Sequence, residues 1–380
     1  MTKISIQTLI LTHEDKQKMS KLNLHAPINN TTGYGITSTN IFLSLLSQDV
    51  DVRLFGIGGI AVDNAETQKV VKTALDKTLT EGWDVNSPCL KIWHQHDLST
   101  SIGKGKYGAL VFFETDTLKP IEKIMINNLD VVFVASKWAK VVLEKNGVTI
   151  PIVVSPLAVN TDIFRDHEHD KVFKNDTYKF INIGKWEIRK GHDFLLEAFN
   201  KAFEKEDNVE LVMINHNQFL SPQENQIWAD MYKNSKLGDK ITVLPRVSTH
   251  VDLAKIIRDV DCGFFPARAE GWNNEILEVM ALNKPVITTD YSAHTEYCTS
   301  DNALLIDIDD LVEADDGKFF NGTGKWADLG ENQMNQTVEH LRKVYKDNIK
   351  TNPEGLKTAQ QYTWQNTANI LKTEMFDANP

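Results

Sequence analysis

The sequence contains few cysteines and no long apolar segment, and both absences narrow the class of protein. Its 380 residues include only Cys89, Cys262 and Cys298, an odd number without the close spacing of a zinc site. Such usage fits a reducing compartment, and we expect a cytoplasmic protein. No run of about 18 apolar residues occurs, and the N-terminus lacks a strongly cationic start, so we expect neither a transmembrane helix nor a signal peptide.

The sequence also lacks an excess of basic residues, internal repeats and low-complexity segments. Its 41 basic and 52 acidic residues give a formal net charge of −11, which argues against a broad nucleic-acid-binding face but leaves room for a local basic groove. A hydrophobic content of 41% supports ordinary globular cores. The length suits two domains of about 180 residues each.

The stretch from Phe264 to Asp290, FFPARAEGWNNEILEVMALNKPVITTD, organises the second half of the chain. Its beginning continues the apolar run 262–266, which suits a buried parallel strand. A helical pattern starts at Asn274, and Pro285 ends it before the next apolar run. We therefore predict a strand, a loop, a helix and a second strand in this order.

Two carboxylates frame that loop and helix. Glu270 follows the strand, and Glu278 lies about one turn into the helix. In an open parallel sheet, ligands bind outside the carboxyl ends of the strands, where a helix N-terminus offers free N–H groups to a phosphate. Each carboxylate accepts hydrogen bonds from two hydroxyl groups, which suits sugar recognition. Glu278 taken alone is typical of a solvated helix residue, and only the whole arrangement favours a binding site.

The segment AEGWNNEILEVMALNKPVI resembles the signature of the retaining glycosyltransferases of the GT-B fold, in family 4 or group 1. That signature reads E-G-F-G-x-x-x-x-E followed by A-M-A-x-G-x-P-V-I. The resemblance implies that Glu270 holds sugar hydroxyls and that Glu278 holds the ribose. It also implies that the residues between them line the donor site, namely Gly271, Trp272, Asn273 and Asn274.

Three residues depart from this signature. Trp272 replaces a phenylalanine, whereas Asn273 and Asn283 replace glycines. Asparagine tolerates left-handed backbone better than most residues do, so we expect both turns to form.

A basic motif opens the predicted second domain. A strand at 178–183 ends in Gly184 and leads to a helix, with Lys185, Arg189 and Lys190 at the junction. Cations beside a helix N-terminus suit a diphosphate, although a lysine-rich surface turn is the alternative. The segment resembles the family motif G-R-L-x-x-x-K-G, with Lys185 in place of the arginine and Lys190 matching the lysine. Lysine lacks the bidentate fork of arginine, and we expect Arg189 to compensate.

The first half of the chain begins with a predicted strand at Ile4–Leu11, followed by a long polar loop that ends at Gly33 and Gly35. An amphipathic helix, ITSTNIFLSLLSQ, comes next. A glycine-containing loop that opens a helix lets the backbone approach a phosphate closely. The resemblance places Gly33 and Gly35 against the donor diphosphate and sugar, and an ordinary helix-start turn is the alternative.

A possible dinucleotide fingerprint follows the next strand, because Gly56, Gly58 and Ala61 match G-x-G-x-x-A. We reject it because it follows the second predicted strand, and because no acidic residue ends a strand about 20 positions later. Asp76 lies in a helical pattern instead. An NAD-dependent oxidoreductase is therefore disfavoured.

A histidine pair follows the predicted strand 90–93. Alternation places His94 and His96 on the same side if the strand persists. Metal binding lacks a third ligand at useful spacing, and a polar loop is the plainer alternative. The resemblance favours a third role, in which His96 touches the transferred sugar and His94 and Asp97 support it.

Three further residues are candidates for the acceptor side. Lys104 and Lys106 lie on the loop SIGKGKYG, and Glu114 ends the strand ALVFF. A solvated turn is the alternative for both lysines. On the donor side, Arg246 ends the strand ITVLPRV, and we expect it to flank the nucleobase or else to be an exposed loop arginine.

The C-terminal part completes the predicted architecture. We predict that ALLIDI is the last strand and that the chain is helical from Trp326, with an interruption near Pro353. The final helix, about 363–380, resembles the family helix that crosses back onto the first domain. The predicted boundaries are 1–165 for an acceptor-binding domain and 177–362 for a donor-binding domain, with 165–176 as the linker.

The resemblance implies an α/β protein of the GT-B fold, with two Rossmann-like parallel-sheet domains facing a central cleft. It implies a retaining hexosyl- or pentosyltransferase that moves a sugar from a nucleotide-diphosphate sugar, with UDP favoured, to a saccharide or other hydroxyl acceptor. We assign the catalytic roles to His96, Glu270 and Lys190. No suitably placed Asp-x-Asp motif occurs, so we expect no metal and no cofactor. Two alternatives stay open: a phage-type enzyme that glycosylates a hydroxymethylated DNA base, and a GT-B-like nucleotide-sugar-binding protein without turnover.

Overall fold

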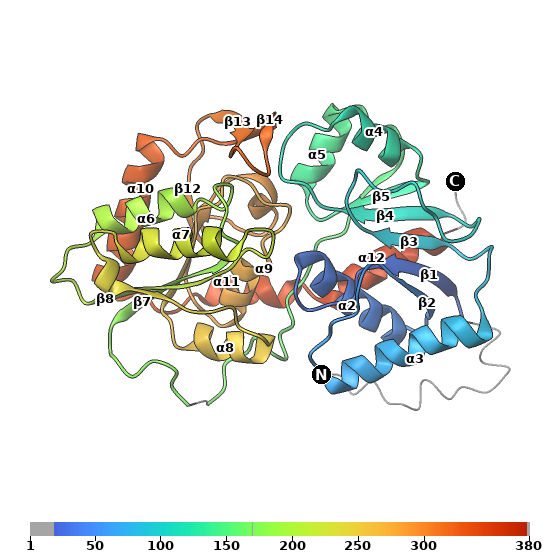
Figure 1. Ribbon diagram of the computed structural model, residues 1–380, viewed down its shortest axis with the longest axis horizontal. Coiled ribbons are helices and arrows are strands. Elements are labelled where there is room, and N and C mark those ends of the chain that lie inside the picture. The colour runs from blue at the N-terminus through green and yellow to red at the C-terminus, as the bar shows by residue number, and fades with distance from the viewer. Residues whose placement is uncertain (1–18, 169, 378–380) are drawn as a thin grey trace. The chain divides into compact units, whose positions relative to one another are not determined.

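The computed structural model describes residues 19–168 and 170–377, so the strand predicted at Ile4–Leu11 lies outside the described residues. The chain divides into two compact α/β units (Figure 1). Each unit contains a six-stranded sheet whose strands are all parallel. Unit 1 comprises Met1–Phe113, Leu118–Ala158 and Tyr362–Pro380, and unit 2 comprises Glu114–Thr117 and Val159–Gln361.

The sheet of unit 1 has the strand order β2-β1-β3-β4-β5-β6. Because β2 and β3 flank β1 on opposite sides, the loops after β1 and β3 meet at the topological switch point, where open α/β sheets bind ligands. The strands are β1 (Lys21–Ala26), β2 (Asp51–Gly56), β3 (Cys89–Ile92), β4 (Tyr107–Val111), β5 (Val131–Val134) and β6 (Ile152–Val154). The helices are α2 (Gly33–Ser47), α3 (Ala65–Glu81), α4 (Pro120–Asn127), α5 (Lys137–Lys145) and α12 (Trp364–Phe376).

Strand β1 corrects one prediction. The segment before Gly33 is not a continuous polar loop, because Lys21–Ala26 forms this strand near the middle of the sheet. Leu22 and Leu24 are buried at alternate positions. Asn23, which makes the segment look polar, is also buried and donates hydrogen bonds to the carbonyls of Asp84 and Ile102. The Asn23 Nδ2 group therefore has its acceptors at a core position that a hydrophobic residue usually fills, whereas Asn23 Oδ1 has no hydrogen-bond partner in the described part of the chain.

The terminal helix α12 belongs to unit 1 and packs against α2 (Figure 1). Its buried residues Trp364, Ala368, Leu371 and Met375 follow helical spacing, so they form one apolar face. Although β6 ends far earlier in the sequence, this last helix completes the core of the first unit. The predicted return of the C-terminal helix to the first domain is confirmed.

The sheet of unit 2 has the order β12-β11-β10-β7-β8-β9, so its switch point lies between β7 and β10. The strand–loop–helix–strand prediction around 262–290 is confirmed. The strands of the sheet are β7 (Tyr178–Gly184), β8 (Val209–Asn215), β9 (Ile241–Val243), β10 (Cys262–Phe265), β11 (Val286–Thr289) and β12 (Leu304–Ile306). The helices are α6 (His192–Ala202), α7 (Pro222–Lys233), α8 (His250–Arg258), α9 (Asn274–Ala281), α10 (Glu331–Lys346) and α11 (Pro353–Gln361), with short 3-10 helices η2 (Gly238–Lys240) and η3 (Ser292–Glu296).

The hairpin of β13 (Leu311–Asp315) and β14 (Asn321–Ala327) corrects a second prediction. ALLIDI is not the last strand, and Trp326 lies in β14 rather than in a helix. The hairpin strands are mostly solvent-accessible, and β14 contains two glycines, so they lack the alternation that marks a strand. Their main anchor is the buried side chain of Trp326, which packs in a small cluster with Ala269 and Ala314. The hairpin therefore packs against the loop that carries Glu270.

Candidate active site

The loop between β10 and α9 carries Glu270 into a buried position at the switch point of unit 2. Only 6% of this residue is exposed. Its N–H donates to Ser292 Oγ at 2.9 Å, and its carbonyl accepts from Ala293 N at 3.2 Å. Both partners lie on η3, which follows the neighbouring strand β11. The backbone on both sides of the Glu270 Cα is thus fixed before any ligand arrives.

The two asparagines that replace family glycines adopt the left-handed conformation, as predicted. The φ angle is 76° at Asn273 and 59° at Asn283. Asn273 immediately precedes α9, and Asn283 ends the turn before β11. Since asparagine populates this region at modest cost, both turns form without glycine.

A neutral histidine supports the turn at Asn273. His294 Nδ1 lies 3.1 Å from the carbonyl of Thr289, so Nδ1 carries the proton and donates it there. His294 Nε2 then accepts from Asn273 Nδ2 at 3.0 Å. Burial lowers the pKa of His294 to about 4, which keeps the ring neutral at physiological pH. The sequence analysis missed this residue because its partners lie on two separate segments.

Across the switch point, the loop between β7 and α6 brings three cations to the same edge. Lys190 Nζ lies 2.7 Å from Glu270 Oε1, and Arg189 Nη1 lies 2.8 Å from Glu270 Oε2. Lys185 Nζ pairs with Glu187 at 2.7 Å instead. Burial alone raises the pKa of Glu270, but Arg189 and Lys190 hold it well below its usual range. Glu270 is therefore ionised throughout the physiological pH range.

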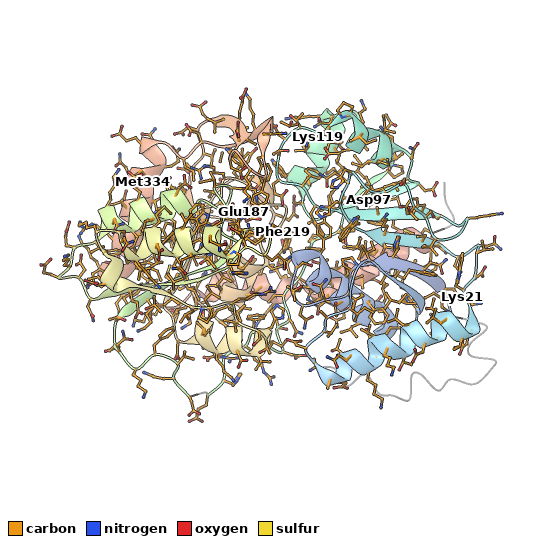
Figure 2. All side chains as sticks on the ribbon, viewed as in Figure 1. Lys21, Asp97, Lys119, Glu187, Phe219 and Met334 are labelled. Carbon is orange, nitrogen blue, oxygen red and sulfur yellow. The ribbon has the colours of Figure 1, made fainter. Side chains whose placement is uncertain are left out.

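Glu187 is a second residue that the sequence analysis missed (Figure 2). Its carboxylate is buried, with 4% of the side chain exposed, and it lies between Lys185 and Arg189. The loop consequently contains its own counter-ion. A carboxylate between basic residues in the sequence was the available signal.

Glu278 is buried on α9 in a different environment. Only 7% of it is exposed, and its carboxyl group has no hydrogen-bond or ion-pair partner among residues 19–168 and 170–377. Burial, with a smaller contribution from Glu275, raises the pKa of Glu278 to about 8. A buried polar group without a partner costs free energy, so Glu278 is a candidate for hydrogen bonds to a ligand.

Two amide oxygens near the same helix start are also unsatisfied. Asn273 Oδ1 and Asn274 Oδ1 are buried and have no hydrogen-bond partner in the described part of the chain. Together with Glu278 they form a cluster of acceptors at the start of α9, where free backbone N–H groups are also available. The cluster suits a polyhydroxylated ligand that carries a phosphate.

In unit 1, the predicted glycines lie in the first turn of α2 rather than in the loop before it. Thr32 caps this helix by accepting from Gly35 N at 3.0 Å. A Cβ on Gly35 would lie 2.2 Å from Oδ1 of Asn29, which itself accepts from the Thr32 N–H. Gly35 therefore permits close packing of the preceding loop. Gly33 has open space at the corresponding position.

The histidine pair lies at the same switch point as the start of α2. The rings of His94 and His96 stack with centroids 5.3 Å apart, and Tyr34 of α2 lies 4.6 Å from His94. His96 is exposed. Asp97 accepts from Trp93 Nε1 at 3.1 Å and lies 3.9 Å from the buried amine of Lys91, so it stabilises the strand end. Folding thus brings the predicted glycines and histidines of this unit together.

The remaining candidates are dispersed. Lys106 donates to the carbonyl of Glu374 on α12 at 2.6 Å, so it anchors the terminal helix, whereas Lys104 is exposed. Glu114 begins the short segment that clusters with unit 2. Arg246 is exposed on the loop after β9, the edge strand of its sheet.

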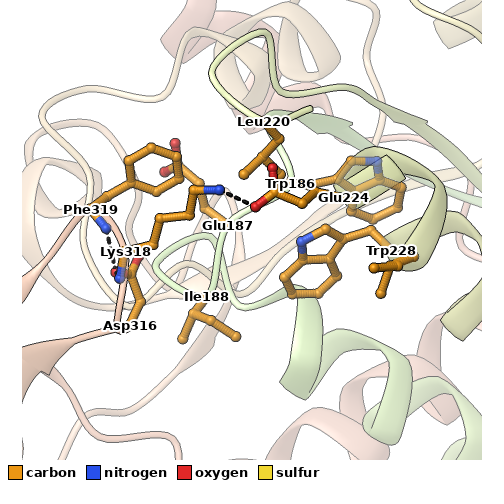
Figure 3. Close-up of a pocket in the computed structure, with 10 residues that line it drawn as sticks. Trp186, Glu187, Ile188, Leu220, Glu224, Trp228, Asp316, Lys318 and Phe319 are labelled. Carbon is orange, nitrogen blue, oxygen red and sulfur yellow. Dashed lines mark hydrogen bonds and ion pairs between the residues drawn. The ribbon is translucent and has the colours of Figure 1, made fainter. Parts of the chain in front are cut away.

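A pocket of about 180 Å³ lies beside the β7–α6 loop (Figure 3). Trp186 and Trp228 stack there with centroids 5.7 Å apart, and Lys318 of the hairpin pairs with Glu224 of α7. No sequence motif indicated this pocket, because its walls come from three distant segments. The lining residues are Trp186, Glu187, Ile188, Leu220, Glu224, Ile227, Trp228, Asp316, Lys318 and Phe319.

Two general features of the described residues bear on the site. Residues 19–168 and 170–377 contain no group of three or more His, Cys, Asp and Glu side chains arranged to hold a metal ion. Within the same ranges, no helix combines the length and the hydropathy that crossing a bilayer requires.

Comparison with known proteins shows what the second unit is similar to. Residues 177–315 match the model of the family described as glycosyl transferases group 1. An uncharacterized glycosyltransferase of Methanocaldococcus jannaschii is 26% identical over 125 residues, which are 33% of this chain and 29% of that protein. The match thus spans less than a third of the curated relative.

Solved structures resemble nearly the whole chain. The sucrose-phosphate synthase of Thermosynechococcus elongatus superposes with a TM-score of 0.68 at 15% identity, covering 95% of this chain and 100% of the other. The HepE protein of Anabaena, in a complex with UDP and glucose, gives 0.66 at 14% identity over 94% and 99% of the two chains. The fold is therefore the GT-B fold, as expected.

Proposed function

We propose that this chain, whose residues 177–315 match the family model of glycosyl transferases group 1, transfers a sugar from a nucleotide-diphosphate sugar to a hydroxyl acceptor. The observation that carries the proposal is the buried, unpartnered carboxyl of Glu278 at the switch point of unit 2. A ribose diol supplies the two hydroxyl donors that this carboxyl group lacks. UDP is the favoured nucleotide, because the similar HepE structure contains UDP and glucose.

We propose that the charged loop binds the diphosphate and orients the residue that holds the sugar. Lys185 and Lys190 neutralise the diphosphate, which gains charge as the glycosidic bond breaks. The free N–H groups at the start of α9 face a phosphate in the same way. Glu270, ionised and rigidly held, accepts hydrogen bonds from hydroxyls of the transferred sugar. In unit 1, His96 is the residue that we propose touches that sugar.

The stereochemistry and metal requirement belong to the same proposal. We propose transfer with retention and without a metal ion, since lysines and the helix dipole supply the positive charge near the leaving phosphate. No second carboxylate is assigned as a nucleophile. The leaving phosphate instead helps to deprotonate the acceptor hydroxyl on the same face.

Nucleotide release from UDP-, GDP- and ADP-sugars tests the proposal, with and without EDTA and with saccharide acceptors or hydroxymethylated DNA added. Release from one donor that EDTA does not abolish supports a metal-independent transferase, and the stimulating acceptor identifies the acceptor class. Nucleotide binding without release under any condition supports the binding-protein alternative. Absence of binding to every nucleotide contradicts the assignment of Glu270 and Glu278.

A further inference from the structure

We propose that Arg189 is a positioning residue that fixes the Glu270 carboxylate, and that it does not bind the donor diphosphate. The sequence analysis assigned it to the diphosphate, as a substitute for the family arginine at the position of Lys185. The proposal rests on the proposed function, in which Glu270 holds hydroxyls of the transferred sugar.

The hydrogen bonds of Arg189 leave little of it for a phosphate. Its Nε and Nη2 atoms donate to Glu187 Oε2 at 3.0 and 2.7 Å. Its Nη1 atom donates to the carbonyl of Ala269 at 2.7 Å and lies 2.8 Å from Glu270 Oε2. Four of the five N–H groups of the guanidinium therefore have partners. Only 3% of the side chain is exposed, so a phosphate has no route to it without breaking these bonds.

The partners of Arg189 join the two loops of the switch point. Its side chain reaches from the β7–α6 loop to the β10–α9 loop, and its carbonyl accepts from Arg268 N at 2.7 Å. Gly191 packs so closely that a Cβ there would lie 2.0 Å from the Pro266 carbonyl. The guanidinium thus spans a rigid junction, and a planar fork that contacts two carboxylates fixes both of them in orientation.

Other buried residues fix the position of Glu187, so Glu187 can in turn fix the position of Arg189. The Glu187 N–H donates to His192 Nδ1 at 3.0 Å, and His192 Nε2 donates to Asn182 Oδ1 at 3.0 Å. Burial, assisted by Lys190, lowers the pKa of His192 to about 3, so the ring is neutral and keeps this tautomer. The chain of contacts from His192 through Glu187 and Arg189 ends at Glu270.

The division of labour among the cations follows from exposure. Lys185 is 41% exposed at its side chain and contacts one oxygen of Glu187, so it can turn to a phosphate. Lys190 approaches Glu270 from the other oxygen, Oε1, and is 10% exposed. When Lys190 turns toward a diphosphate, Arg189 remains to keep Glu270 ionised and oriented. The need to keep a cation beside Glu270 explains why the loop contains Arg189 in addition to Lys185 and Lys190.

Measurements of UDP binding and of catalytic activity distinguish a positioning role of Arg189 from a role in binding the diphosphate. We compare Arg189→Met with Arg258→Met, which removes another buried arginine of unit 2 that donates to the carbonyls of Arg165 and Ile163. The readouts are Kd for UDP, and kcat and KM for release from the active nucleotide sugar. In Arg189→Met we expect UDP binding within about twofold of wild type, and kcat about 100-fold lower, as for a misplacement of about 1 Å. Arg189→Lys should recover part of kcat.

The pH dependence of kcat provides a second test, because a general loss of protein stability does not shift its acid limb. The charged or titratable groups around the Glu270 carboxylate are Arg189 and Lys190 of the β7–α6 loop and His294 of η3. Loss of Arg189 removes the largest attraction that lowers the Glu270 pKa, so the acid limb of kcat should move to higher pH. In Arg258→Met the limb should stay where it is in wild type.

The outcomes distinguish the positioning role from the proposed function. UDP affinity that falls tenfold or more in Arg189→Met, with the acid limb unchanged, overturns the positioning role and leaves the proposed function intact. Wild-type protein that binds no nucleotide contradicts the proposed function itself, and the positioning role with it. If Arg189→Met does not fold, the Glu187→Gln/Arg189→Met pair removes both buried charges together and permits the same measurements.

Discussion

Glu278 shows what one buried side chain reveals about a binding site. Glu270 and Glu278 are both buried glutamates of the same motif, yet their pKa values shift in opposite directions. Glu270 has two cations within 2.8 Å, whereas Glu278 faces only the negative charge of Glu275. The first carboxylate is therefore held in place by two cations of the protein, whereas we propose that a ligand supplies the partners of the second.

Glu278→Gln should stabilise the protein at neutral and alkaline pH. Between pH 4.5 and 8 the unfolded chain has released the Glu278 proton while the folded protein retains it, so the folded state loses relative stability as pH rises. The glutamine removes this pH-dependent loss of folding free energy. At about 1.4 kcal/mol per pKa unit, the loss amounts to about 3 kcal/mol at pH 7. Urea unfolding at several pH values measures it. The gain should vanish below pH 4.5, and the exposed Glu339→Gln should show none.

Nucleotide binding should release a proton near neutral pH. A ribose diol stabilises the ionised form of Glu278, whose pKa in the free protein is about 8, so affinity should rise as pH increases toward 8. Calorimetry of UDP binding in buffers of different ionisation enthalpy counts the released protons. In Glu278→Gln the affinity should be weaker and nearly independent of pH over this range. A wild-type Kd that does not vary between pH 6 and 8 would contradict the ribose assignment.

At the scale of elements, the same arrangement occurs in both units. In each sheet the chain reverses its direction of growth beside one strand, β1 in unit 1 and β7 in unit 2. The loops that follow these strands and their neighbours β3 and β10 carry most of the candidate residues. Since parallel strands place their carboxyl ends at one edge, residues far apart in sequence meet there. The start of α2 is one place where this packing is close, because a Cβ on Gly35 would lie 2.2 Å from Asn29 Oδ1.

Gly35→Ala should destabilise unit 1, and Gly33→Ala should not. The added Cβ at Gly35 meets the amide of Asn29, which accepts from the N–H of the capping residue Thr32, so we expect a loss of about 1–3 kcal/mol. At Gly33 the space is open and alanine favours the helix, so stability should be unchanged or slightly higher. Thermal unfolding measures both variants. Equal stability of the two would show that the loop around Asn29 moves aside freely.

At the scale of the whole molecule, the C-terminal segment of the chain returns to the first unit. The last helix, α12, follows unit 2 in sequence and completes the core of unit 1. A change in this helix should therefore act on the unit that is remote in sequence rather than on the adjacent one.

Leu371→Ala should destabilise unit 1 selectively. Leu371 is fully buried on α12, so removing its side chain should cost about 2–5 kcal/mol. Hydrogen exchange by mass spectrometry should show faster exchange in β1–β6 and unchanged exchange in β7–β12. The exposed Thr373→Ala on the same helix should leave both units unchanged. Faster exchange confined to unit 2 would contradict the assignment of α12 to the first unit.

The sequence by itself determined the elements whose pattern is local and strong. The strand, loop and helix around Glu270 and Glu278 follow from an apolar run, a polar turn and a helical period, and the asparagines at 273 and 283 are compatible with the turns they form. Strands β7 and β8 are mainly apolar because both faces are buried, although each also contains a charged residue and an asparagine. Local patterns of this kind persist in the folded protein because burial of the same residues stabilises them.

Only the tertiary structure decided the elements and contacts that depend on distant partners. β1 contains an asparagine that is acceptable in the core only because two distant carbonyls accept its hydrogen bonds. The β13–β14 hairpin is held mainly by Trp326 against the Glu270 loop, so its own residues carry little strand pattern. Arg189 looked like a phosphate ligand because its charge is visible in the sequence. Its partners Glu187 and Glu270 lie on two loops that meet only when β10 pairs with β7, and that pairing decides its role.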